Sequence, residues 1–116
     1  MDEDQRMAKR LPVPLDICLG VQSVYTPVWK TRDISIQGAF VAMPPDGVDV
    51  GAPVEAIVTI KNGAPAVGEP PPTEVVQIAA RVVRRSEDGI GLAFTDYDSR
   101  AYSALVNLIY RTGNTQ

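Results

Sequence analysis

The chain has 116 residues, 45% of them hydrophobic and 22% charged, so its length and composition fit one globular domain with its own core. With 11 Lys and Arg against 14 Asp and Glu, its net charge of −3 argues against a broad nucleic-acid-binding surface. The absence of histidine excludes a Ser-His-Asp triad, and the single Cys18 cannot form an internal disulfide or a usual zinc site, so we expect no metal, no cofactor and no enzymatic activity.

The N-terminus is acidic and polar, reading Met1-Asp2-Glu3-Asp4-Gln5, which is the opposite of a secretory signal. No apolar run approaches the roughly 18 residues that a membrane span requires. We therefore expect a cytoplasmic protein that does not insert directly into membranes. Residues 1–10 carry no apolar pattern, and we expect a flexible tail over residues 1–12 ahead of a single domain over residues 13–116.

Three strands are predicted in the first half of the chain. Apolar and polar residues alternate over residues 13–19, which is typical of a half-buried strand. Residues 24–34 are rich in β-branched and aromatic side chains and predict a second strand, in which Pro27 indicates an edge or a bulge. A third strand over residues 38–43 ends at the turn signal Pro44-Pro45-Asp46-Gly47.

The second half predicts three more strands and a helix. Alternation continues over residues 54–61, and after a loop rich in Gly and Pro over residues 62–72, two strands over residues 75–84 and 90–95 are joined by an Asp-Gly hairpin signal. Apolar residues then recur at helical spacing from Asp98 or Ser99, with Gly113 placed to end the helix. The pattern predicts a mostly β fold, a small six-stranded antiparallel β-barrel with one C-terminal α-helix.

Two motifs carry chemistry. Arg6 and Arg10 lie just before the first predicted strand, and a guanidinium can pair with the O6/N7 edge of guanine, stack on a base or bind phosphate. Downstream, in Asp33-Ile34-Ser35-Ile36-Gln37-Gly38, the carboxylate can accept from guanine N1 and N2, the hydroxyl can bond phosphate or base, and the glycine allows close backbone approach. Together they favour a guanine nucleotide as ligand.

In this order, and followed by Gly89-Ile90-Gly91-Leu92-Ala93-Phe94, these motifs resemble those of the PilZ domain family, whose members sense the bacterial second messenger cyclic di-GMP. The resemblance covers nearly the whole chain and implies the same barrel and helix. It implies that both arginines grip guanine edges and phosphates, that Asp33 and Ser35 bind guanine and adjacent ligand atoms, and that Gly38 keeps the turn tight. The motif is compatible with one bound nucleotide or with a stacked pair.

By resemblance, the chain is expected to be a non-catalytic receptor for cyclic di-GMP. Binding that fixes Arg6 and Arg10 would order the N-terminal tail and change the surface of the barrel. Because no output domain is attached in this sequence, we expect the signal to pass to a separate partner protein. Motility, exopolysaccharide synthesis, biofilm formation and virulence are the outputs that the resemblance implies.

Other interpretations of the same residues stay open. The arginines could be solvated terminal charges, Asp33 and Ser35 could form an Asx or Ser turn, and Gly38 could simply serve a hairpin. One alternative function is a PilZ-type protein-interaction module for type IV pilus assembly or motility that binds no nucleotide. Another is a small enzyme that uses Asp33 or Ser35 with a lysine. Lys9, Lys30 and Arg32 could add positive potential, and Trp29 and Tyr25 are expected to pack rather than bind ligand.

Overall fold

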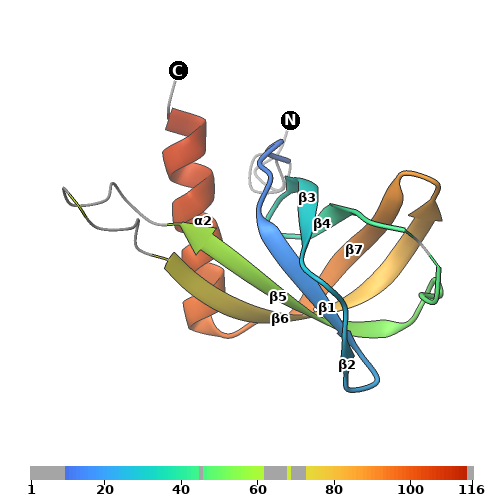
Figure 1. Cartoon of the computed structure of the whole chain (residues 1–116). Coiled ribbons are helices and arrows are strands. Elements are labelled where there is room, and N and C mark those ends of the chain that lie inside the picture. The colour runs from blue at the N-terminus through green and yellow to red at the C-terminus, as the bar shows by residue number, and fades with distance from the viewer. Residues whose placement is uncertain (1–9, 45, 62–67, 69–72, 115–116) are drawn as a thin grey trace, which may run out of the picture.

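The computed structural model describes residues 10–44, 46–61, 68 and 73–114. This part of the chain forms a strongly bent antiparallel sheet and a helix that stands beside it (Figure 1). The elements in chain order are β1 (Asp16–Val21), β2 (Val24–Tyr25), β3 (Trp29–Ile34), β4 (Gly38–Ala42), β5 (Pro53–Lys61), β6 (Thr73–Ser86), β7 (Gly89–Asp96) and α2 (Ser99–Asn114).

Six of the strands close into a barrel. The strand order is β2-β1-β3-β4-β7-β6-β5, every pairing is antiparallel, and β1 also pairs with β5, which joins the two ends of the sheet. Ile17 of β1 therefore lies opposite Trp29 of β3 on one side and Val58 of β5 on the other. The predicted six-stranded barrel is confirmed, with β2 as an additional short strand outside it.

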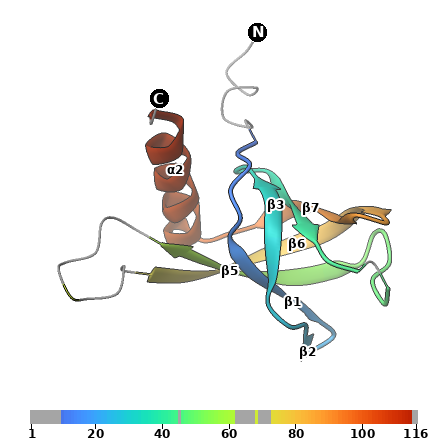
Figure 2. The same ribbon diagram turned by 45° about the horizontal axis from the view of Figure 1, so that its top comes forward.

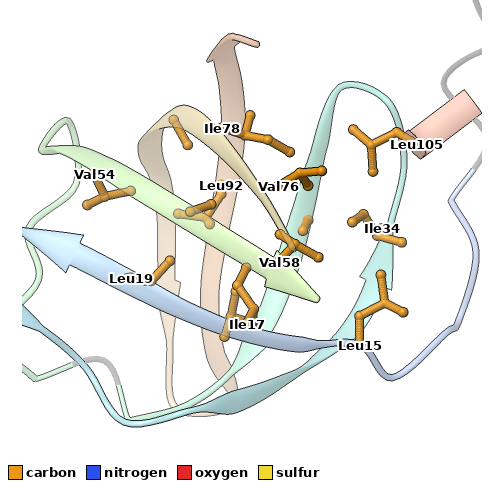
Figure 3. Close-up of a cluster of buried hydrophobic side chains, with 14 of the residues drawn as sticks. Leu15, Ile17, Leu19, Ile34, Val54, Val58, Val76, Ile78, Leu92 and Leu105 are labelled. Carbon is orange, nitrogen blue, oxygen red and sulfur yellow. The ribbon is translucent and has the colours of Figure 1, made fainter. Parts of the chain in front are cut away.

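The core fills the inside of the barrel with aliphatic side chains. Alternate residues of each strand point inward, as the period of a strand requires. Figure 3 shows that Ile17 and Leu19 from β1 converge with Val58, Ile78 and Leu92 from the facing strands. All five side chains are at most 1% exposed. These buried side chains are the apolar residues of the alternating patterns that predicted the strands.

The strand predicted over residues 24–34 is two strands in the structure. Pro27 lies between β2 and β3, where it cannot donate to a ladder. The Thr26 amide instead donates to Leu19 O at 2.9 Å, which ends β2 against β1. Thr31 of β3 accepts a hydrogen bond from the Leu15 amide and donates one to Val13 O, so residues 13–15 are held beside β3 before β1 begins.

The helix α2 begins where the sequence predicted and runs slightly further. Asp98 is its N-cap, because its Oδ1 accepts from the Ala101 amide at 2.8 Å. Ala101, Ala104 and Leu105 are buried against the barrel, and both views place α2 next to the outer end of the β5–β6 pair (Figure 2). Gly113 lies within the last turn instead of beyond it. Within the described residues, no helix is long and apolar enough to span a membrane.

Candidate functional site: a charged pocket on the outer face of the barrel

One row of residues crosses four neighbouring strands. Asp33 of β3 lies opposite Phe40 of β4, Phe40 lies opposite Gly91 of β7, and Gly91 lies opposite Arg84 of β6. The neighbours of Phe40 along β4 belong to the core, whereas Phe40 itself does not. Since successive side chains of a strand point to opposite faces, this row lies on the outer face of the barrel.

A pocket of about 320 Å³ lies over this row. Its wall on one side is built from β3 and the segment before β1, and on the other side from β6. The floor is supplied by β4 and β7. The lining residues are Arg10, Asp33, Ala39, Phe40, Val83, Arg84, Gly91 and Leu92. The pocket thus joins residues from the first motif, from the second motif and from the late glycine-containing strand.

The two sequence motifs meet in an ion pair. Arg10 Nη1 donates to Asp33 Oδ1 at 2.6 Å across 23 residues of sequence. Leu11 fixes this contact, because its amide donates to Ile34 O at 2.8 Å and its carbonyl accepts from the Ile34 amide at 3.0 Å. Leu11 is also 4% exposed, although it falls inside the predicted tail. The C-terminal end of the arginine motif is therefore bound to the strand that carries Asp33.

Irregular strand pairing aims two further arginines at the site. The register of β3 against β4 shifts between Thr31 and Asp33, which makes Arg32 an extra residue. The register of β6 against β7 shifts in the same way between Val82 and Arg84. An extra residue of this kind breaks the alternation of inward and outward side chains and redirects its neighbours. Arg32 and Arg84 consequently flank Phe40 from two different strands.

Phe40 is covered by these guanidinium groups. Arg32 Cζ lies 3.8 Å from the centroid of the ring and Arg84 Cζ lies 5.2 Å from it, both within cation–π range. The ring is only 3% exposed, although Phe40 is not part of the hydrophobic cluster inside the barrel. The planar guanidinium of either arginine offers a face on which a nucleobase can stack.

The charges of the site are unbalanced in favour of cations. Asp33 faces Arg10 Nη1 at 2.6 Å and Arg32 Nε at 4.0 Å, while Arg84 adds a third guanidinium. Three arginines and one aspartate give the site a local charge of about +2 within a chain of net charge −3. Such a site can attract an anion and present bidentate donors to it.

Ser35 and Gly38 shape the turn that leads out of Asp33. The Ser35 amide donates to Gly38 O at 2.8 Å, and Ser35 Oγ accepts from the Gln37 amide at 3.0 Å. Ser35 is 1% exposed. A Cβ on Gly38 would lie 2.1 Å from Leu92 O, so this position packs directly on β7. Neither residue lines the pocket, and their direct contact with a ligand stays a prediction.

The turn is also braced from the start of α2. Tyr97 donates its phenol proton to Ile36 O at 3.1 Å, and its ring contacts Phe94 and Tyr102 at centroid distances of 6.3 and 5.4 Å. Burial and the nearby Tyr102 raise the pKa of Tyr97 above its usual value. The second motif is thereby joined to both the barrel and the segment that begins the helix.

The site contains residues that the sequence analysis did not identify, and one of the predicted site residues is not described by the structure. Arg6 lies outside the described residues. Phe40, Arg84 and Gly91 line the pocket but belong to neither of the two ligand motifs. The alternation of β6 breaks at Val83-Arg84, which was a visible signal of a bulge. That signal does not predict that Arg84 pairs with Gly91 of β7.

Comparison with known proteins agrees with this architecture. The PilZ domain family model matches residues 4–111. The structure of the Bacillus subtilis inhibitor of motility (MotI/DgrA) is similar, with a TM-score of 0.74 and 18% identity over 96% of this chain and 53% of that chain. The PilZ domain of CeSA from a cellulose-synthesizing bacterium is also similar, with a TM-score of 0.66 and 18% identity over 92% of this chain and 100% of that domain.

This chain therefore spans about half the length of the inhibitor of motility. No curated protein matches it. At 18% identity, the two solved structures support the fold alone. The family match includes both arginines of the first motif, the whole second motif and most of α2. The chain belongs to the PilZ domain family.

Proposed function

We propose that this protein is a non-catalytic receptor for cyclic di-GMP and that the pocket over Phe40 is its ligand site. The observation that carries the proposal is the contact between Arg10 and Asp33, because it joins the two motifs at one pocket. An arginine and an aspartate in contact offer both kinds of hydrogen-bonding group that a guanine base requires on its two edges.

The charge of the site around the pocket supports the same ligand. A cyclic dinucleotide carries two phosphate charges, which match the local charge of about +2 from Arg10, Arg32 and Arg84 against Asp33. Guanidinium groups bind phosphate through paired hydrogen bonds and stack on bases. Arg6 is proposed to complete the clamp from the other end of its motif.

Signalling is proposed to run through the N-terminal tail to a separate partner protein. The Leu11 amide already donates to Ile34 O, so ligand-dependent ordering is expected at residues 6–10, ahead of that anchor. Hydrogen exchange of the full chain tests this, and saturating cyclic di-GMP should slow the amides of residues 6–10. Unchanged exchange there would mean that the signal leaves by another surface.

Calorimetric titration of the full chain with cyclic di-GMP tests the binding itself. Arg6→Ala and Arg10→Ala should each weaken binding by about 1 to 3 kcal/mol, the value of one bidentate guanine contact. Arg100→Ala is a matched control, because Arg100 Nε donates to Glu74 Oε2 at 2.9 Å in another exposed arginine–carboxylate pair away from the pocket.

The melting temperatures of the ligand-free variants separate binding from folding. Arg10 and Arg100 both belong to exposed pairs, which contribute only about 0 to 1 kcal/mol to stability. We therefore expect both variants to melt close to wild type, with only Arg10→Ala impaired in binding. Absence of saturable binding by the wild type would refute the receptor function and favour the protein-interaction module, whereas conversion of the ligand would indicate an enzyme.

A further inference from the structure

The β6 wall of the pocket contains a cation that neither motif supplies. Arg84 lines the pocket across the row from Asp33, with Phe40 and Gly91 between them. Val83, the extra residue of the bulge, is 52% exposed and lines the same wall. The bulge therefore places Arg84 opposite Gly91 and gives the pocket a second charged side.

Gly91 holds this arrangement open. A Cβ on Gly91 would lie 3.3 Å from Arg84 Cβ, 3.9 Å from Arg84 Nε and 3.9 Å from Phe40 Cδ2. Without that atom, the Arg84 side chain extends over the glycine toward the Phe40 ring. The strand position between the arginine and the aromatic ring thus contributes space instead of a side chain.

Arg84 differs from Arg10, which also lines the pocket, and from the adjacent Arg32 in its electrostatic partners. Arg10 and Arg32 both face the Asp33 carboxylate. Among the described residues, Arg84 forms no ion pair with a carboxylate, and its guanidinium lies over the face of the Phe40 ring. An anion can bind Arg84 without breaking an ion pair, so this guanidinium keeps its full charge for a ligand.

We propose that Arg84 is a third ligand-binding arginine, which anchors a phosphate of the nucleotide on the β6 side of the pocket. The inference rests on the proposed function and assigns a residue outside both motifs. Arg10 and Asp33 together provide the donors and acceptor for a guanine base on the β3 side. A lone cation on the opposite wall complements the negatively charged sugar-phosphate ring.

Titration of wild type, Arg84→Ala, Arg84→Lys and Arg85→Ala with cyclic di-GMP at several salt concentrations tests this. Arg85→Ala is the matched control, because Arg85 is the next residue of β6 and its replacement removes the same charge. Arg85 does not line the pocket, and its Nη1 lies 3.8 Å from Asp49 Oδ1. Arg84→Ala should weaken binding at least tenfold and reduce the dependence of log Kd on log salt by about one charge. Arg84→Lys should recover part of the affinity, and Arg85→Ala should stay within about threefold of wild type at physiological salt.

The possible results distinguish the role of Arg84 from the receptor function itself. Wild-type affinity in a folded Arg84→Ala variant would overturn the assignment of Arg84 while leaving the receptor function standing. A phosphate contact would be contradicted if Arg84→Lys bound as weakly as Arg84→Ala and both variants kept the salt dependence of the wild type. A wild type that does not bind would overturn the proposed function, and this inference with it. Thermal melts confirm that each variant is folded.

Discussion

Gly38→Ala should destabilise the fold strongly, although the added group is a single methyl. The new Cβ would lie 2.1 Å from the backbone oxygen of Leu92, whereas carbon–oxygen contacts between strands are normally about 3.3 Å or longer. The two strands would have to separate by about 1 Å at this point. Backbone atoms of paired strands cannot move aside independently, so the end of the β4–β7 ladder must open.

The expected cost follows from what that opening disrupts. Overpacking costs about 1 to 3 kcal/mol, and the bonds from the Ser35 amide to Gly38 O and from the Phe94 amide to Gln37 O each contribute about 0.5 to 1.5 kcal/mol. Replacing Gly by Ala returns about 0.4 to 1 kcal/mol through the unfolded chain. The middle of these ranges gives a net loss of about 3 kcal/mol, or about 12 °C in melting temperature for a domain of this size.

Gly20→Ala is the matched control. Its Cβ would also be too close to a neighbour, at 2.8 Å from Tyr25 Cε1, but that ring belongs to a side chain that is 54% exposed and can turn away. Urea unfolding and thermal melts of both variants measure the difference, and Gly20→Ala should stay within about 1 kcal/mol of wild type. If Gly38→Ala is as stable as Gly20→Ala, the close contact with Leu92 does not govern this turn.

Three further predictions concern selectivity, the tail and pH. Asp33→Ala should lose preference for cyclic di-GMP over cyclic di-AMP as well as affinity, and equal binding of both ligands by the wild type would show that Asp33 does not read guanine. Replacing Asp2, Glu3 and Asp4 by Asn, Gln and Asn should tighten binding by up to roughly tenfold at low salt and less at physiological salt, and unchanged or weaker binding would exclude competition by these acids. Because burial raises the pKa of Tyr97 from 10.0, its stabilising contribution is present below about pH 10 and lost as pH rises further, so Tyr97→Phe should flatten the alkaline fall in stability measured by urea unfolding.

The fold was predictable because its signals are local. Alternation over residues 54–61 and 75–84, the Asp88-Gly89 hairpin signal and the helical spacing after Asp98 each describe one element and its neighbour. The division of β2 from β3 at Pro27 was visible only as an edge or a bulge, since its form depends on how Thr26 bonds to β1. Closure of the barrel by β1 and β5 agrees with the expected architecture.

The site was predictable in part. The sequence placed Arg10 and Asp33 in one proposed ligand site, and the structure brings these two together. Arg84 and Phe40 could not be found in this way, because their neighbourhood depends on the registers of β6 with β7 and of β4 with β7. Two bulges set the direction of Arg32 and Arg84, and sequence alternation alone does not define the register that a bulge produces.

The most direct test of the central claim is an NMR titration of the ¹⁵N-labelled full chain with cyclic di-GMP, with the backbone amides assigned. Binding in the proposed pocket should cause saturable shifts that are largest at Arg10, Asp33, Phe40, Arg84 and Gly91, all of which line it. Amides near Tyr25 of β2 should change little, because β2 pairs with the end of β1 at Gly20 and Val21, whereas β3 pairs with the other end. Shifts centred on β2 or α2, or no saturable shifts at all, would contradict the account.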